Sequence, residues 1–185
     1  MKSLLNIINE KLKIKHSLNK NNINDEDLNE IYKPQTKNEL IDIIEYFITK
    51  YGDDVDLNFI NTSQITDMSH LFKKFPNFNG DIDLWNVSNV KDFNAMFKDC
   101  KKLEQMNLTH WNVEKCKDFS DMFYNCKSLK TIGDISNWDI SKAKFMINMF
   151  DGCSSLVLDL SKWKFPERCQ TMYITRGANN IKLVK

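Results

Sequence analysis

The sequence predicts an α/β solenoid, an array of short strand-plus-helix units behind a helical N-terminal cap. Three observations carry this prediction. A tryptophan-centred pattern recurs at a nearly constant interval, apolar residues recur at fixed distances from each tryptophan, and an amphipathic helix pattern precedes the first unit. A single unit of this size cannot bury its own apolar residues, so the units are expected to stack.

The recurring pattern is anchored on one isoleucine and four tryptophans. The anchors are Ile60, Trp85, Trp111, Trp138 and Trp163, at intervals of 25, 26, 27 and 25 residues. Two further sets of residues, which we call columns, stand at fixed distances after the first four anchors. The first column is Phe72, Phe97, Phe123 and Phe150, and the second is Phe75, Cys100, Cys126 and Cys153. A period of about 20–29 residues is typical of leucine-rich-repeat-like arrays, so these columns are expected to form the repeat core.

Each unit is predicted to contain one short strand and one short helix. The aliphatic residue three before each anchor, such as Leu108 or Ile135, stands between polar neighbours, which is the alternation of a half-buried strand. Ser63, Ser88 and Ser141 follow their anchors and are predicted to cap the helix.

The predicted organisation has three parts. Residues 1–54 form the helical cap, residues 55–165 hold four to five units of 25–27 residues, and residues 166–185 form a C-terminal capping turn and strand. The clearest helix of the cap begins at Thr36, which forms a capping box with Glu39, and ends at Gly52. Residues 168–174 are predicted to make a last helical turn and residues 180–184 a last strand.

The composition excludes several classes of function. The 185 residues include 26 Lys or Arg and 25 Asp or Glu, so a net charge of +1 gives no overall attraction for nucleic acid or membranes. A cytoplasmic location is expected, because the sequence shows no signal peptide, lipid-modified cysteine or transmembrane segment. Five cysteines, an odd number, fit free thiols better than a disulfide framework.

One motif supports a family resemblance. The stretch W-N-V-S-x-V-x-D-F-x-x-M-F-x-x-C from Trp85 to Cys100, and the related stretch from Ile65 to Phe72, resemble the repeat of the BspA-like leucine-rich-repeat surface proteins. That repeat is also known as the mycoplasmal lipoprotein-type repeat, and the resemblance covers about residues 55–165. Members of that family are typically exported and implicated in adhesion and partner binding, so the resemblance implies a binding role.

No catalytic, metal or cofactor site is predicted. Cys100, Cys126 and Cys153 share one column without any Cys-x-x-Cys pair, so a buried ladder explains them better than zinc. The tryptophans fit core packing better than an aromatic cage or a sugar platform. His70 and His110 occupy different positions of the unit, with no nucleophile at a known spacing from either. We therefore expect a protein that binds rather than an enzyme.

Two polar columns flank the aliphatic residue of each predicted strand. The candidate partner-binding residues in these columns are Asp56, Asp81, Asp83, Asn107, Thr109, Asp134, Ser136 and Asp159. Both columns face outward if the residue between them faces inward, and carboxylates stacked about 4.7–4.9 Å apart repel one another unless something compensates them. Three explanations stay open: hydrogen bonds to neighbouring loop amides, a partner with a basic surface, or a cation site.

The expected function is that of a protein-binding module acting through this sheet face and the adjoining loops. The first alternative is an intracellular stoichiometric inhibitor that blocks a bacterial nuclease, either a phage anti-defence protein such as an anti-CRISPR or a toxin-immunity protein. The second is an adhesin-type surface protein. The expected partner is another protein with a basic surface, with no direct binding to nucleic acid or membrane, and a monomer is the default oligomeric state.

Overall fold

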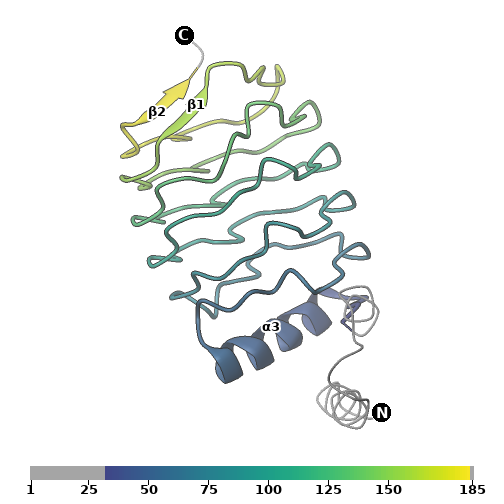
Figure 1. The fold of residues 1–185 in the computed structure, drawn as a ribbon. Coiled ribbons are helices and arrows are strands. Elements are labelled where there is room, and N and C mark those ends of the chain that lie inside the picture. Colours follow the sequence, from purple (N-terminus) through teal and green to yellow (C-terminus); the bar gives the residue numbers. More distant parts are fainter. Residues whose placement is uncertain (1–31, 184–185) are drawn as a thin grey trace, which may run out of the picture.

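A computed structural model describes residues 32–183 of the chain. One helix, α3 (Lys37–Tyr51), lies at one end of the described part, and two short strands, β1 (Leu158–Leu160) and β2 (Ile181–Leu183), lie at the other (Figure 1). The two strands pair in parallel, with Leu158 opposite Ile181 and Leu160 opposite Leu183. Turns, bends and isolated bridges make up most of the chain between them.

The sequence signals for α3 are local, and this helix is confirmed. The Thr36 hydroxyl accepts a hydrogen bond from the Glu39 amide at 3.2 Å, and Gly52 ends the helix with a φ of 93°. The capping box differs in one detail, because the Glu39 carboxylate accepts from the Gln35 amide at 2.7 Å and not from that of Thr36. Leu40, Ile43, Ile44 and Phe47 form the buried face of α3, which covers the apolar core of the following residues.

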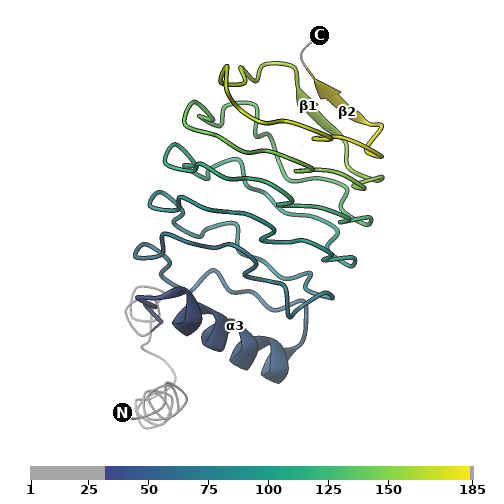
Figure 2. The same ribbon diagram turned by 180° about the vertical axis from the view of Figure 1, so that it is seen from behind.

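After α3 the chain winds back and forth in turns that lie over one another, as both sides of the molecule show (Figures 1 and 2). We call these turns layers and define them as residues 53–79, 80–104, 105–130, 131–157 and 158–183. Backbone hydrogen bonds join neighbouring layers: the Phe97 amide donates to Met122 and the Phe123 amide to Met149, each at 2.9 Å. Parallel isolated bridges reinforce them at Asp56–Asp81, Asp67–Asp92, Asp92–Asp118, Gln105–Thr131, Asp118–Phe145 and Phe145–Gln170.

The predicted fold class, an α/β solenoid of leucine-rich-repeat-like strand-plus-helix units, is wrong. Among residues 32–183 there is one helix, which precedes the layers, and one sheet of two three-residue strands. Of the aliphatic residues predicted to centre a strand in each unit, only Leu160 lies in one. Ser63, Ser88 and Ser141 cap no helix, and their amides donate instead to the side chains of Asn61, Asn86 and Asp139.

Left-handed backbone explains why no helix forms within a layer. One residue in each layer has a φ between 52° and 57°, namely His70, Ala95, Asp121, Asn148 and Tyr173. A residue in this region interrupts an α-helix. The segments that follow close by hydrogen bonds over three residues, as from the Phe75 amide to the Phe72 carbonyl at 2.8 Å, and remain turns.

The core between the layers is built from aromatic and sulfur-containing columns. The rings of Phe72, Phe97, Phe123 and Phe150 stack on one another at centroid distances of 5.0, 5.3 and 5.7 Å. Trp85, Trp111, Trp138, Trp163, Cys100, Cys126 and Cys153 are buried in the same cluster. The Cys126 and Cys153 thiols donate to the carbonyls of Phe97 and Phe123, at 3.1 and 2.9 Å. These columns hold consecutive layers together by stacking.

The two ends of the chain differ from expectation in part. The predicted last strand is confirmed as β2, but residues 168–174 contain turns and a bridge in place of a helical turn. The first 31 residues of the predicted N-terminal cap lie outside the described residues. The division at residues 54 and 165 stays a prediction.

Candidate binding face

The polar columns predicted from the sequence lie along the side of the layers that ends in β1 and β2. Asp159 is the middle residue of β1, and Asp56 and Asp81 form a parallel bridge between the first two layers. Leu57, Ile82 and Ile135, the residues between the two columns, are buried, so the polar side chains face outward.

Each member of the first column closes a turn with its own side chain. The amide two residues later donates to it in every layer: Asn58 to Asp56 at 2.8 Å, Asp83 to Asp81 at 2.9 Å, Thr109 to Asn107 at 3.4 Å, Ser136 to Asp134 at 2.9 Å and Ser161 to Asp159 at 2.8 Å. Aspartate and asparagine both make such turns, which explains why Asn107 takes the same place as four aspartates. Hydrogen bonds to loop amides thus engage one oxygen of each carboxylate and leave its charge in place.

The first three members of the second column, Asn58, Asp83 and Thr109, each link their layer to the next. The Asn58 side-chain oxygen Oδ1 accepts from the Leu84 amide at 2.8 Å, and the Asp83 carboxylate accepts from the Asn107 amide at 2.9 Å. The Thr109 hydroxyl accepts from the Asp134 amide at 3.0 Å. Asp83 and Thr109 therefore have a structural role, whatever else they contact.

The carboxylates gather around one hollow of about 660 Å³, which we call the acidic hollow. Its lining comprises Asp54, Asn79, Gly80, Asp81, Asp83, Glu104, Gln105, Met106, Asn107, Thr131 and Gly133. Asp81, Asp83 and Asn107 were predicted from the polar columns. Asp54 and Glu104 were missed. Asp54 shares with Asn79 and Gln105 a polar column six residues before the anchors, which could have found it, whereas Glu104 is not in that column.

Two glycines allow the backbone to approach closely at this hollow. A Cβ on Gly80 would stand 2.1 Å from the Val55 carbonyl oxygen. Gly133 has a φ of 77°, and a Cβ there would stand 2.5 Å from Asn107 Oδ1 and 2.6 Å from Thr109 Oγ1. A larger residue would displace the Val55 backbone at Gly80 and the Asn107 and Thr109 side chains at Gly133, so the shape of the hollow depends on both glycines.

The charges of the acidic hollow are largely uncompensated by the described part of the chain. Glu104 pairs with Lys130 at 2.6 Å, but Asp54, Asp81 and Asp83 have no ion pair with another described residue. Burial raises the pKa of Asp83, and the neighbouring carboxylates of Asp81 and Asp56 raise it further, against the Asn107 amide, which lowers it. A cation from outside would relieve this repulsion.

A second hollow of about 510 Å³ lies nearer β1 and β2 and has mixed charge. Asp134, Ser136 and Asp159 line it together with Lys162 and Lys182. The Lys182 ammonium lies 3.0 Å from Asp159, whose pKa falls to about 2 through the hydrogen bonds from Ser161 and the contact with Lys182. Six of the eight predicted residues thus line two hollows, and Asp56 and Thr109 line neither.

The described residues include no candidate metal-ligand cluster and bury four of their five thiols. Within residues 32–183, no group of three or more His, Cys, Asp or Glu side chains is arranged to hold a metal ion. Burial raises the pKa of Cys100, Cys116 and Cys153 to about 12, so these thiols stay protonated and are poor nucleophiles. In the same range, the one helix is too short and too polar to cross a membrane.

Comparisons with known proteins identify a family model that covers most of the chain. The model is described as "Mycoplasma protein of unknown function, DUF285", and it matches residues 42–163 and residues 130–183. No curated protein and no solved structure matches the chain.

Proposed function

Because this chain belongs to the DUF285 family, described as mycoplasma proteins of unknown function, we propose that it is a non-enzymatic protein-binding module. The acidic hollow receives a basic segment of a partner protein. The observation that carries this proposal is that Asp54, Asp81 and Asp83 meet at one hollow without an ion pair to the rest of the described chain. Complementary charge on a partner speeds its encounter and selects against acidic proteins.

The size and lining of the hollow fit a lysine or arginine side chain. A volume of about 660 Å³ exceeds one side chain and accommodates a short basic stretch. Asn79, Gln105 and Thr131 add neutral hydrogen-bonding groups around the carboxylates. An arginine fork pairs with two carboxylate oxygens at once, which makes a guanidinium the best complement to this lining.

Affinity capture from the native host tests the proposal. The bait is the tagged full chain, compared with an Asp54→Asn/Asp81→Asn/Asp83→Asn variant in which asparagine keeps the turn hydrogen bonds, as Asn107 does in the same column. A matched control, Asp42→Asn/Asp139→Asn/Glu167→Gln, removes three exposed carboxylates elsewhere. We expect a partner held by the wild type and by the control to be lost with the first variant, after equal thermal stability has been verified.

Equal recovery of the same proteins by all three baits contradicts the proposal. A partner that is recovered is then purified, and its affinity for the wild type is measured at two salt concentrations. Charge-driven binding weakens as salt increases, whereas binding through apolar contacts does not.

Inhibition of a nuclease by occupation of its basic surface is a second candidate function. The observation that favours it is the run of carboxylates on successive layers, since parallel neighbours lie about 4.7–4.9 Å apart and present a line of negative charge. The purified chain should then inhibit a host nuclease at a one-to-one ratio in a cleavage assay. Loss of inhibition in the triple asparagine variant, but not in its control, would tie the effect to the acidic hollow.

Membership of DUF285 and the Trp85–Cys100 motif also support a relationship to the BspA-like surface proteins, which we include in the proposal. A surface location and an intracellular inhibitor exclude each other. Cell fractionation separates them: recovery of the native protein at the cell surface supports an adhesin-type role, and recovery in the cytoplasm supports the expectation from the sequence.

A further inference from the structure

A second charged surface, of opposite sign, lies on another side of the layers. We call it the lysine face and define it by six exposed residues, Lys91, Lys115, Lys117, Lys142, Lys144 and Arg168. They alternate with the buried side chains of Val90, Cys116 and Ala143, so they point outward on both sides of an inward-facing column. The lysine face spans the layers from residue 80 to residue 183.

Backbone hydrogen bonds hold the central lysines of this face in one column. The Lys117 amide donates to the Lys91 carbonyl at 2.9 Å, and the Lys144 amide donates to the Lys117 carbonyl at 2.8 Å. Successive ammonium groups are therefore anchored on adjacent layers. Like charges at this spacing repel one another unless an anion lies between them.

The described chain supplies such anions only in part. None of the six residues forms an ion pair with a described residue, and the nearest polar contact is that of Lys115 with the neutral Asn89 side chain at 2.8 Å. Asp92 and Asp118 are the carboxylates on the same side, but they are half-buried and accept hydrogen bonds from the Asn94 and Ser120 amides, at 2.8 and 2.7 Å. Glu114 and Glu167 share turns with Lys115 and Arg168, and Asp139 interacts electrostatically with Lys142, so the compensation is partial and the Lys91, Lys117 and Lys144 column is left without an ion pair to a described residue.

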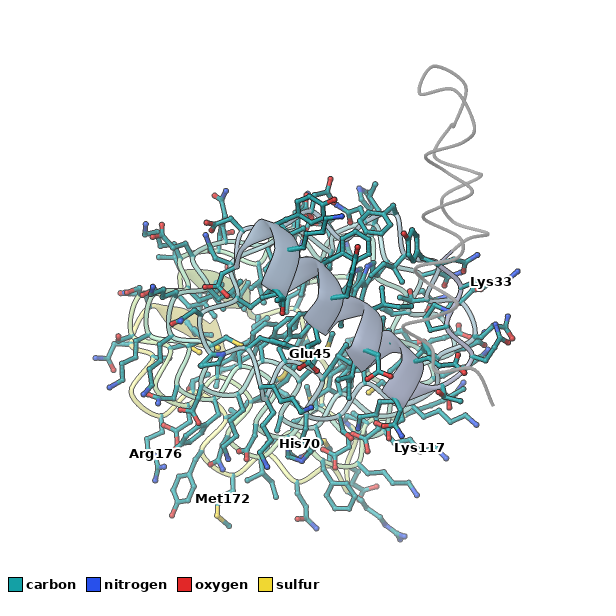
Figure 3. All side chains as sticks on the ribbon, turned by 90° about the horizontal axis from the view of Figure 1, so that it is seen from below. Lys33, Glu45, His70, Lys117, Met172 and Arg176 are labelled. Carbon is teal, nitrogen blue, oxygen red and sulfur yellow. The ribbon has the colours of Figure 1, made fainter. Side chains whose placement is uncertain are left out.

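The two charged surfaces do not neutralise each other within one molecule. Lys117 projects from a different side of the molecule than the one on which β1 and β2 lie (Figure 3). Elsewhere opposite charges do pair, as in Lys98–Asp121, Lys130–Glu104 and Lys182–Asp159, at 2.7, 2.6 and 3.0 Å. The net charge of +1 therefore conceals an acidic hollow and a lysine column, neither of which the described part of the chain compensates fully.

We propose that the lysine face binds the acidic hollow of a second copy of this chain. The inference rests on the proposed function, because it assigns the basic partner surface of the hollow to the chain itself. Both surfaces are built on the same layers, so their charges have the same spacing along the stack, about 4.7–4.9 Å. Two copies with parallel stacks bring carboxylates of one opposite ammonium groups of the other in register.

The contact joins two different surfaces of identical chains, so it is a head-to-tail contact. Each copy keeps one free acidic hollow and one free lysine face, and the association continues into a ring or a filament. Single exposed ion pairs contribute little, and the assembly is expected to be weak, reversible and sensitive to salt.

Sedimentation of the purified full chain at increasing concentration tests the proposal. We expect the average mass to increase with concentration at about 10 mM ionic strength, where charges act over about 30 Å, and the monomer to return at about 1 M, where they act over about 3 Å. Two variants each remove one surface: Asp54→Asn/Asp81→Asn/Asp83→Asn and Lys117→Glu/Lys144→Glu. Each alone is expected to weaken association at least about tenfold.

Mixing the two variants gives the decisive result. The lysine variant keeps its acidic hollow and the asparagine variant keeps its lysine face, so one wild-type contact forms between them and the assembly stops at a one-to-one complex. The control is Lys73→Glu/Lys127→Glu, which changes the net charge equally at two exposed lysines outside the lysine face. Mixed with the asparagine variant, it is expected to form larger assemblies, because its own lysine face is intact.

A wild-type chain that stays monomeric at low salt overturns the inference, as does association that neither variant weakens. Equal stability of all variants in thermal unfolding excludes loss of folding as the cause. The proposed function is judged separately by capture from the host. If capture depends on the hollow while the pure chain stays monomeric, the inference fails and the proposed function stands. If the pure chain associates but capture of host proteins does not depend on the hollow, self-association stands and the proposed function fails.

Discussion

The indole N–H of Trp138 donates a hydrogen bond to the backbone carbonyl of Leu108, 3.1 Å away and thirty residues earlier in the chain. The other tryptophans make the same contact one layer back: Trp85 to Leu57, Trp111 to Asp83 and Trp163 to Ile135, at 2.9, 3.3 and 2.9 Å. Each of the four tryptophan anchors therefore ties its layer to the preceding one through a polar group and an apolar ring. A phenylalanine would supply only the ring.

Replacement of Trp138 by phenylalanine should lower the stability of the fold. The Leu108 carbonyl would lose one of its two donors and keep the Trp111 amide, so the loss is that of one hydrogen bond, about 0.5–1.5 kcal/mol. We expect a decrease of that size in the free energy of unfolding, measured by urea denaturation. Leu84→Ala, at a side chain that is 76% exposed, is the control and should change stability little. A Trp138→Phe variant as stable as the wild type would show that the hydrogen bond contributes nothing.

Replacement of Gly133 by alanine should deform the acidic hollow. The new Cβ would meet the Asn107 and Thr109 side chains at 2.5 and 2.6 Å, in addition to the strain of a φ of 77°. Gly52→Ala is the matched control, because its φ of 93° is strained as well but its Cβ would meet nothing within 4 Å. We expect Gly133→Ala to weaken both stability and partner binding, and Gly52→Ala to affect stability alone. Equal binding by the two variants would contradict this.

The pH dependence of stability should have opposite signs at two aspartates of the same face. Burial, with Asp81 and Asp56 nearby, raises the pKa of Asp83, so its contribution to stability is present below the unfolded pKa of 3.8 and is lost as the pH rises through the raised pKa. The Ser136 amide lowers the pKa of Asp134, so its contribution is present above 3.8 and is lost as the pH falls through the lowered pKa.

At pH 7, Asp83→Asn should therefore be at least as stable as the wild type and Asp134→Asn less stable. Thermal unfolding at a series of pH values measures both, and each difference should shrink on the acidic side of 3.8. A decrease in stability for Asp83→Asn at neutral pH would show that its ionised form is favoured in the fold.

Four of the five cysteines should be unreactive in the native protein. Cys100, Cys116, Cys126 and Cys153 are buried and burial raises the pKa of each, whereas Cys169 is partly exposed. A thiol reagent should label about one site per native chain and all five after denaturation. Cys169→Ser should abolish the native labelling, and Cys126→Ser should leave it unchanged. Rapid labelling of several sites in the native state would contradict the burial of this column.

The sequence predicted what depends on spacing and on local signals. Thr36 and Gly52 delimit α3 because a cap and a stop act within one turn of the helix. Phe97 and Phe123 stand at the same distance from their tryptophans, and their rings stack at 5.3 Å because the layers have the same length as the sequence period.

The conformation within each layer was not predictable in the same way. The left-handed position is occupied by residues as different as His70, Ala95 and Tyr173, and neither alanine nor tyrosine signals a positive φ. The strand and helix assigned to each unit failed for this reason. In the acidic hollow, Asp81, Asp83 and Asn107 were found from the two polar columns. Glu104 stands at the end of its layer in the sequence, and it reaches the hollow only because the layers stack.

The aromatic column ends in a hydroxyl. Thr175 follows Phe150 in the same hydrogen-bond register, since the Phe150 amide donates to Ile174 as the Phe123 amide donates to Met149. A further layer laid on Thr175 would bury that hydroxyl against apolar carbon, which is unfavourable. A layer inserted between Phe97 and Phe123 would meet a phenyl ring above and below. An internal position between Phe97 and Phe123 would therefore accept an extra layer more readily than the end that bears Thr175.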